Sequence, residues 1–181
     1  KDFPLAFGKF DKLKEIINGL LLLAGVGQMT KVEMTELDMP VIVENAQKRL
    51  AEMIDKSNAH ISVPDTWPAA AGHDLWVEEI WTNYLSNALK YGGTPPVVSL
   101  GAESLPNGDV RFWVQDNGTG LSVDEQKIIF APFTRLQPER AEGHGLGLAI
   151  VQRIVGKLGG NVSVQNAADE GNVFYFTLPG L

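Results

Sequence analysis

Two asparagines and a lysine lie close together in the segment NYLSNALKY at residues 83–91. The apolar residues around them recur with a helical period, so Asn83 and Asn87 share one face of a predicted helix, with Lys90 close to Asn87. An amide oxygen such as that of Asn87 suits Mg²⁺, a hard cation that is usually shared with substrate phosphates, and Lys90 would counter phosphate charge. The alternative is a solvated polar stripe on an amphipathic helix.

A carboxylate stands at the end of a predicted strand in the segment VRFWVQDNGTGL. Apolar and polar residues alternate from Val110 onward, as in a half-buried strand, and Asp116 ends the alternation. This carboxylate can accept a hydrogen bond from an amino group such as adenine N6, while Gly118 and Gly120 let a base approach the backbone. The alternative is an Asx turn that closes a hairpin.

Three glycines open a predicted helix in the segment GHGLGL at residues 143–148. Gly143, Gly145 and Gly147 precede a run with one apolar face. Backbone N–H groups and the helix dipole favour phosphate at such a helix N-terminus. The spacing is G-x-G-x-G and no βαβ unit surrounds it, so the dinucleotide fingerprint G-x-G-x-x-G fits poorly. On its own, a glycine triplet is usually a turn.

Hydrophobic periodicity predicts the elements that would position these clusters. We expect helices at about 9–26, 40–57, 74–91 and 146–158, and strands at about 60–64, 97–103, 109–115, 161–166 and 172–178. Asp74 is the expected N-cap of the helix at 74–91. The order of elements predicts an α+β fold, a two-layer α/β sandwich whose mixed sheet is covered on one face by three helices and is preceded by a bundle helix.

The composition excludes several classes of protein. A chain of 181 residues with 44% hydrophobic content can bury one good-sized core plus an appendage. Zero cysteines exclude disulfides and thiolate metal sites. No apolar stretch is long enough to span a membrane and no signal peptide is visible, so we expect a cytoplasmic location, with membrane anchoring of the full-length protein left open. A net charge of −7 and scattered Lys and Arg argue against nucleic-acid binding.

The first predicted helix carries an apolar stripe with alternating spacings of three and four residues. Its members are Phe10, Leu13, Ile17, Leu20 and Ala24. Such a seam is typical of a coiled coil or a four-helix bundle. The alternative is a core helix that packs on the domain that follows.

The clusters NYLSNALKY, DNGTG, FAPFTR and GHGLGL resemble, in this order, the N, G1, F and G2 boxes of the catalytic ATP-binding domain of bacterial sensor histidine kinases. The wider superfamily includes gyrase-type topoisomerases, a heat-shock chaperone and mismatch-repair ATPases. The resemblance covers about residues 35–179 and implies a Bergerat-type fold with ATP and Mg²⁺ as cofactors. Residues 1–34 would then be a partial dimerisation and histidine-phosphotransfer helix with its linker, and residues 35–181 the catalytic ATP-binding domain.

The resemblance also implies residue roles by position. Asn87 would bind Mg²⁺, and Asp116 would read the adenine amino group. Lys90 and Arg135 would act with Asn87 in catalysis, with Arg135 beside the phosphates. The segment from Phe133 to Gly145 resembles the mobile ATP lid in a short form. The nucleotide contacts as a whole comprise Asn83, Asn87, Lys90, Tyr91, Asp116, Gly118, Gly120, Gly143, His144, Gly145, Leu146 and Gly147.

Two positions distinguish this chain within the superfamily. Members that hydrolyse ATP carry a glutamate four residues before the metal-binding asparagine, whereas this chain has Asn83 there. An amide cannot act as general base, so water is a poor nucleophile in this site, and in the kinases a histidine imidazole takes the γ-phosphoryl group instead. After Gly171, where the family often has a small hydroxyl residue, this chain has Asn172, which bears only on a peripheral contact.

None of the three histidines matches the phosphoacceptor. His73 in HDLW loosely mimics the start of the acceptor box, but no Thr-Pro-Leu follows and it directly precedes the helix predicted at 74–91. His60 lies in the strand-like HISVP and is interpreted as structural, and His144 as exposed, with a phosphate contact as the alternative. The acceptor histidine is therefore expected before Lys1, on the first helix of the bundle.

The resulting prediction is a protein-histidine kinase catalytic domain. It would transfer the ATP γ-phosphoryl group to a histidine of the dimerisation bundle, for relay to the receiver domain of a response regulator. The implied partners are ATP, the histidine-bearing dimerisation domain, the receiver domain and a second copy in a homodimer of the full-length protein. The alternative is a superfamily ATPase or a nucleotide-binding regulatory module, in which ATP drives only a conformational change. Asn83 disfavours hydrolysis.

Overall fold

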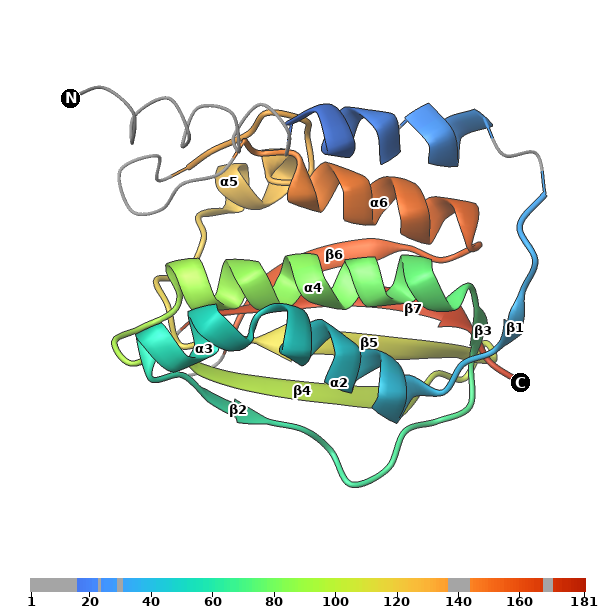
Figure 1. Ribbon diagram of the computed structural model, residues 1–181, viewed down its shortest axis with the longest axis horizontal. Helices are drawn as coiled ribbons and strands as arrows, with labels where there is room; N and C mark the ends of the chain where they lie inside the picture. The colour runs from blue at the N-terminus through green and yellow to red at the C-terminus, as the bar shows by residue number, and fades with distance from the viewer. Residues whose placement is uncertain (1–15, 23, 29–30, 137–143, 168–170) are drawn as a thin grey trace.

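The computed structural model describes residues 16–22, 24–28, 31–136, 144–167 and 171–181. Its centre is a five-stranded sheet with the strand order β2-β4-β5-β7-β6 (Figure 1). The parallel pair is β2 (His60–Ser62) with β4 (Val97–Ser104), and the strands paired antiparallel after β4 are β5 (Asp109–Gln115), β7 (Asn172–Pro179) and β6 (Val162–Asn166). The predicted mixed sheet is thereby confirmed.

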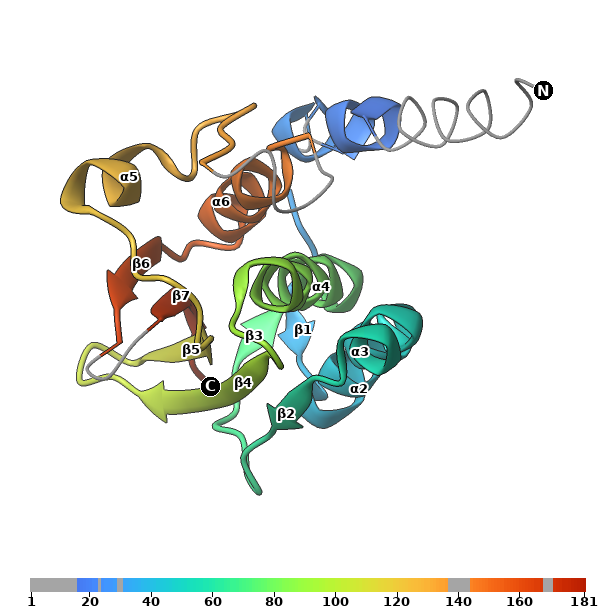
Figure 2. The ribbon, with the colours of Figure 1, turned by 90° about the vertical axis from the view of Figure 1, so that its left-hand side faces the viewer.

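Helices cover one face of this sheet (Figure 2). The central helix is α4 (Asp74–Tyr91), and its neighbours are α2 (Met39–Arg49) and α3 (Ala51–Ser57) on one side and α6 (Gly147–Lys157) on the other. The opposite face of the sheet carries no helix in the described part of the chain. The predicted two-layer α/β sandwich is therefore confirmed.

Two details of the predicted helices are wrong. The helix expected at 40–57 divides into α2 and α3 at Leu50, whose N–H donates to the carbonyl of Gln47 in place of the helical partner four residues back. The N-cap of α4 is His73, and its side chain makes no cap hydrogen bond. Asp74 lies instead in the first turn of α4, where its negative charge suits the helix dipole.

The two layers meet in an aromatic core. Alternate side chains of β5 and β7 are buried, so Phe112 and Phe176 point toward the helices and stack with ring centroids 5.0 Å apart. Trp81 of α4 packs edge-on against both rings. Its indole N–H donates to Sδ of Met39 in α2, with the nitrogen 3.1 Å from the sulfur. This core fixes α4 on the sheet and so positions its polar edge, which carries Asn87.

Three short elements were not predicted. A capping box starts α5 (Val123–Ile128), because Ser122 Oγ accepts from the N–H of Glu125 while the Glu125 carboxylate accepts from the N–H of Ser122. The pattern S-x-x-E is the sequence signal that could have found it. A two-stranded antiparallel sheet pairs β1 (Thr35–Glu36) with β3 (Ala71–Gly72). Strands of this length show no periodicity.

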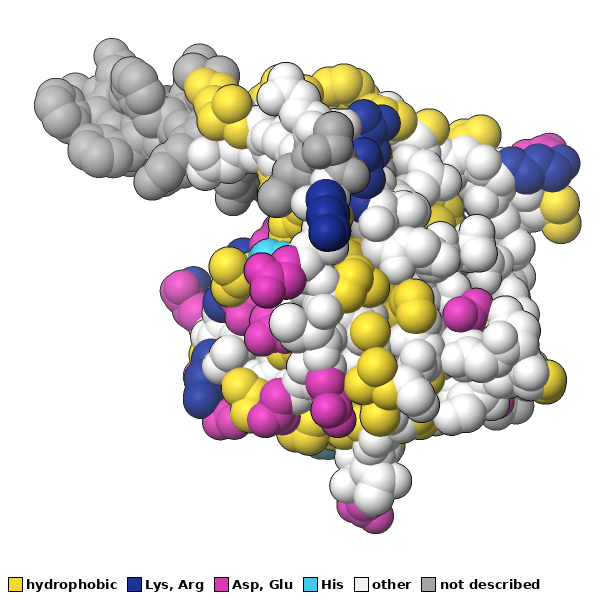
Figure 3. Space-filling view, turned by 90° about the vertical axis from the view of Figure 1, so that its right-hand side faces the viewer, with side chains coloured by type: hydrophobic (Ala, Val, Ile, Leu, Met, Phe, Trp, Pro, Cys, Tyr) yellow, Lys and Arg dark blue, Asp and Glu magenta, His cyan; other side chains and the backbone are white. Residues whose placement is uncertain are grey.

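Residues 16–22 and 24–28 are helical and lie alongside α6 (Figure 1). Two members of the predicted apolar stripe fall outside the described residues, namely Phe10 and Leu13. Others are exposed, by 46% at Ile17 and 44% at Leu20, and hydrophobic side chains gather on this outer side (Figure 3). Gly19, on the opposite side, packs against α6, where a Cβ would lie 3.2 Å from the Leu146 side chain. The helix thus packs on the domain, but the described part of the stripe faces away from it.

No helix within the described ranges has the length and apolarity needed to cross a membrane.

Candidate functional site

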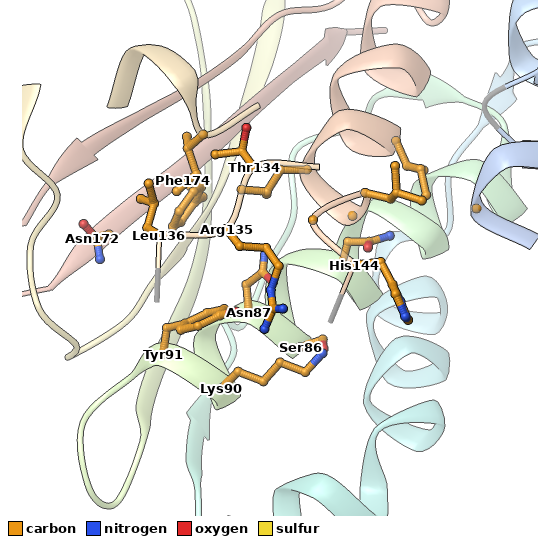
Figure 4. A pocket seen from close by; sticks show the side chains of 18 of the residues that line it. Ser86, Asn87, Lys90, Tyr91, Thr134, Arg135, Leu136, His144, Asn172 and Phe174 are labelled. Carbon is orange, nitrogen blue, oxygen red and sulfur yellow. The ribbon is translucent and has the colours of Figure 1, made fainter. Parts of the chain in front are cut away.

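A cavity of about 650 Å³ lies between α4, the N-terminus of α6 and β7 (Figure 4). Its volume is typical of sites for small ligands. It brings together most of the predicted site residues, namely Asn83, Asn87, Lys90, Tyr91, Asp116, Arg135, His144, Gly145, Leu146 and Gly147. Gly118 and Gly120 line a neighbouring depression instead. Gly143 lies outside the described residues.

One end of the cavity holds a buried carboxylate. Asp116 is 5% exposed, and its Oδ1 accepts from the backbone N–H of Gly118 at 2.8 Å and of Asn172 at 3.2 Å. Burial raises the pKa of the Asp116 carboxyl above its ordinary value, although these hydrogen bonds oppose the rise. The apolar side chains that line the same cavity include Leu121, Ile129, Leu136 and Phe174. This end can therefore hold a flat ring that presents an amino donor.

Asn172 was expected to bear only on a peripheral contact, but it is 5% exposed and lines the cavity. Its Oδ1 accepts from the N–H of Leu121 at 3.0 Å, and its Nδ2 donates to the carbonyl of Thr119 at 3.0 Å. Its backbone carbonyl accepts from the N–H of Asp116 at 2.9 Å. Asn172 therefore fixes the loop that follows β5. The sequence signal is a polar residue at the start of the otherwise apolar run NVFYF.

Gly118 supports the site from outside the cavity. A Cβ at this position would lie 2.2 Å from the carbonyl oxygen of Tyr91, so only glycine lets the loop lie against the end of α4. Asn117 ties the same two segments together, since its Oδ1 accepts from the N–H of Gly93 at 2.9 Å and of Val97 at 2.8 Å. The bond from Gly118 to Asp116 makes an Asx turn, as one alternative proposed, but this turn leads toward α5 and closes no hairpin.

The other end of the cavity is polar. Ser86, Asn87 and Lys90 lie along the edge of α4, and Arg135 points into the cavity from the start of the predicted lid (Figure 4). The N-terminus of α6, with Gly147, forms the facing wall, and the first backbone N–H groups of a helix, which have no partner within the helix, favour an anion such as phosphate.

The donor set at this polar end fits Mg²⁺ better than a softer metal. In the described part of the chain, no group of three His, Cys, Asp or Glu side chains could hold a metal ion. The oxygen donors at this end are the amides of Asn83 and Asn87 and the carboxylate of Glu79, and water and ligand phosphates would add to them. Mg²⁺ takes oxygen ligands of these kinds.

A backbone hydrogen bond joins the first and last residues of the predicted lid. The N–H of Phe133 donates to the carbonyl of Gly145 at 2.8 Å. Phe133 has a φ of 62°, a left-handed conformation that is rare for a bulky residue. Residues 137–143, most of this predicted lid, lie outside the described residues.

Several lining residues were not predicted. Arg49 comes from α2 and Glu79 from an earlier turn of α4, while Asn18, Gly19 and Leu22 come from the first helix. No local pattern marks Arg49 or the residues of the first helix, because each of them reaches the cavity only through packing between elements. Glu79 lies four residues before Asn83 on the same helix, a spacing that could have found it.

The three histidines lie in different surroundings. His144 lines the cavity. His60 is exposed on β2, with its Nδ1 at 3.2 Å from the carbonyl oxygen of Asn58. His73 lies at the start of α4, with its ring centroid 5.3 Å from that of Trp76. Neither of the last two belongs to the cavity lining.

Comparisons with known proteins agree with this geometry. The family described as histidine kinase-, DNA gyrase B-, and HSP90-like ATPase matches residues 72–180. The methanogenesis regulatory histidine kinase FilI of Methanothrix harundinacea (strain 6Ac) is 31% identical over 169 residues, which is 93% of this chain and 19% of FilI. The chain spans only 19 to 43% of the length of the first curated relatives that it matches.

Solved structures show the same fold. Full-length ShkA in complex with AMPPNP is 27% identical, with a TM-score of 0.80 over 94% of this chain and 36% of the ShkA chain. The mycobacterial sensor histidine kinase MprB is 26% identical, with a TM-score of 0.70 over 82% of this chain and 97% of the MprB chain.

Proposed function

Because the chain belongs to the histidine kinase-, DNA gyrase B-, and HSP90-like ATPase family, we propose that it is the ATP-binding catalytic domain of a sensor histidine kinase. It would transfer the γ-phosphoryl group of ATP to a histidine of a dimerisation bundle, for relay to the receiver domain of a response regulator. One observation carries the proposal: a single cavity has the buried carboxylate of Asp116 at one end, and Asn87 and Lys90 at the other.

Each end of the cavity would take one part of the nucleotide. The adenine amino group would donate to Asp116 while the apolar lining buries the ring. The phosphates would lie at the N-terminus of α6, where Lys90 and Arg135 would neutralise the charge that develops on the transferring group. Asn87 would hold Mg²⁺, which supplies further charge neutralisation when bound.

The asparagine at position 83 favours a kinase over an ATPase. Its amide lines the cavity at the position where hydrolysing members of the superfamily carry the general-base glutamate. An amide takes no proton from water, so the γ-phosphoryl group would wait for a stronger nucleophile such as a neutral imidazole.

The first helix supports a division of the chain into a dimerisation segment and a catalytic domain. We divide the chain into residues 1–34, a partial dimerisation helix and linker, and residues 35–181, the catalytic domain. Ile17, Leu20 and Leu21 are exposed on the first helix, and such a row of apolar side chains would be buried in a helical bundle with a second copy. The full-length protein would then be a homodimer whose catalytic domains work in the cytoplasm.

Calorimetry with Mg·ATP and Mg·GTP tests the nucleotide site. Guanine presents a carbonyl where adenine presents its amino donor, so GTP should bind much more weakly than ATP. Equal affinities would refute the role of Asp116. Transfer of labelled γ-phosphate to the protein's own histidine-bearing bundle domain distinguishes a kinase from a regulatory module, which would bind ATP without any transfer.

A further inference from the structure

A second carboxylate lines the cavity at the end assigned to phosphate. Glu79 lies on α4 one turn before Asn83, and its side chain is 26% exposed. A negative charge here would repel a polyphosphate unless a cation neutralised it. Arg49 of α2 supplies that cation, since its Nη1 and Nη2 both donate to Glu79 Oε2 at 3.1 Å. The ion pair holds the carboxylate at the wall of the cavity.

The other carboxylate oxygen of Glu79 binds Asn83. The Nδ2 group of Asn83 donates to Glu79 Oε1 at 3.1 Å and to the Glu79 backbone carbonyl at 2.8 Å. These two bonds use both N–H groups of the amide. Because an asparagine amide can sit either way round with little change in shape, its hydrogen-bond partners decide its orientation. The Oδ1 atom therefore faces α6, where a Cβ on Gly147 would lie 2.4 Å from it.

We propose, on the basis of the function proposed above, that Glu79 and Arg49 are positioning residues that turn the carbonyl oxygen of Asn83 into the phosphate end of the cavity. Turned the other way, the amide would direct two N–H donors at Mg²⁺. In the orientation that Glu79 holds, Asn83 would present an oxygen at the end of the cavity where Asn87 would hold Mg²⁺. Groups that orient a metal's surroundings typically change metal affinity or activity by about 10–100-fold.

Glu78 provides a matched control. It carries the same charge on the same helix, its Oε1 accepts from Arg49 Nη1 at 3.2 Å, and its side chain is 18% exposed. It is neither part of the cavity lining nor a hydrogen-bond partner of the Asn83 amide. Removal of Glu78 or of Glu79 therefore changes the charge beside Arg49 equally. Only the second change takes a side-chain acceptor away from the Asn83 amide, which is then held by the Glu79 backbone carbonyl alone.

The first test measures how strongly Mg²⁺ enhances binding of AMPPNP, a non-hydrolysable ATP analogue. The wild type, Glu79→Ala, Glu79→Gln and Glu78→Ala are titrated in Mg²⁺ and in EDTA. We expect Glu79→Ala to reduce the enhancement about tenfold. Glu79→Gln should keep most of it, because its Oε1 can accept the same hydrogen bond, and Glu78→Ala should keep it. An unchanged enhancement in Glu79→Ala, or an equal reduction in Glu78→Ala, would overturn the proposal.

The second test needs no nucleotide. In NMR spectra of the nucleotide-free chain, Glu79→Ala should shift the side-chain amide signals of Asn83 and accelerate their exchange with water, whereas Glu78→Ala should not. Unchanged Asn83 signals in Glu79→Ala would overturn the proposal. A wild type that failed to bind AMPPNP would instead refute the proposed function. Thermal unfolding shows whether each variant is folded. If Glu79→Ala does not fold, Glu79→Met replaces it, because methionine keeps the length of the side chain without a carboxylate acceptor, and the same results are expected for it.

Discussion

At the scale of single residues, the buried carboxylate of Asp116 carries the selectivity for adenine in the proposed function. In Asp116→Asn, a neutral oxygen replaces the charged acceptor. A charged acceptor contributes about 1 kcal/mol or more beyond a neutral one, so we expect ATP affinity to fall about tenfold. Calorimetry measures the change, and GTP binding should change far less. A variant that binds ATP as tightly as the wild type would contradict the role.

The same residue should make both stability and ATP binding depend on pH. Burial raises the pKa of Asp116, so the folded protein binds this proton more tightly than the unfolded chain does. The ionised carboxylate therefore lowers the free energy of unfolding at pH values above the folded pKa. This loss shrinks as the pH falls below the folded pKa and is gone below the ordinary pKa of the unfolded chain.

Asp116→Asn should accordingly be more stable than the wild type at neutral pH, and the difference should shrink in mildly acidic buffer. Thermal unfolding across this range measures it. ATP affinity of the wild type should decline over the same window, because adenine needs the carboxylate. If the ATP affinity of Asp116→Asn declined in the same way with falling pH, a group other than Asp116 would be responsible for the pH dependence.

Asn87 is the residue assigned to Mg²⁺. Asn87→Ala removes an oxygen ligand, so phosphoryl transfer should fall by about 100-fold or more, while AMPPNP affinity in EDTA should change little. Transfer assays and calorimetry measure the two effects. Asn107→Ala, which changes an exposed asparagine in the loop between β4 and β5, is the control and should leave both unchanged. If Asn87→Ala lost AMPPNP affinity in EDTA by the same factor as phosphoryl transfer, the result would argue against a role of Asn87 in binding Mg²⁺.

At the scale of elements, α4 and α6 meet at the polar end of the cavity, and two glycines of α6 test this contact. A Cβ at Gly147 would lie 2.4 Å from Asn83 Oδ1, whereas a Cβ at Gly156 would meet no atom within 4 Å. Glycine inside a helix costs about 0.5–1 kcal/mol relative to alanine. Gly156→Ala should therefore raise the free energy of unfolding by about that amount and leave AMPPNP affinity unchanged.

Gly147→Ala should behave differently although it makes the same chemical change in the same helix. The new methyl group would displace Asn83 and narrow the phosphate end, so Mg²⁺-dependent AMPPNP binding should weaken. Calorimetry and thermal unfolding compare the two variants. Identical nucleotide affinities would show that the contact between Gly147 and Asn83 has no part in binding.

At the scale of the whole molecule, the proposed reaction needs two components, the catalytic domain and a domain that carries the acceptor histidine. Because none of the three histidines resembles the acceptor and Asn83 cannot activate water, this chain should bind Mg·ATP without labelling itself. A separate bundle domain that carries the acceptor histidine should restore transfer, at a rate limited by encounter because the two parts are not tethered. Labelled γ-phosphate reports the transfer. Acid-labile label on His60, His73 or His144 in stoichiometric yield would show that the acceptor has been misplaced.

Local periodicity predicted most of the fold. The predicted helix at 74–91 and strand at 109–115 coincide with α4 and β5, because the spacing of apolar residues reports which side of an element is buried. The same signal does not report where a helix is interrupted, so the break at Leu50 was missed.

From the sequence alone, residue type and local spacing were enough to pick out Asp116, Asn87 and Lys90, and all three line the cavity. Two contacts that complete the cavity could be seen only in the folded chain: Asn172 is buried against the loop after β5, and Arg49 reaches Glu79 from another helix. Local spacing could not predict these contacts, because it reports only which side of an element is buried. The contact between α2 and α4 depends instead on how the aromatic core packs the two helices together, which no short segment encodes.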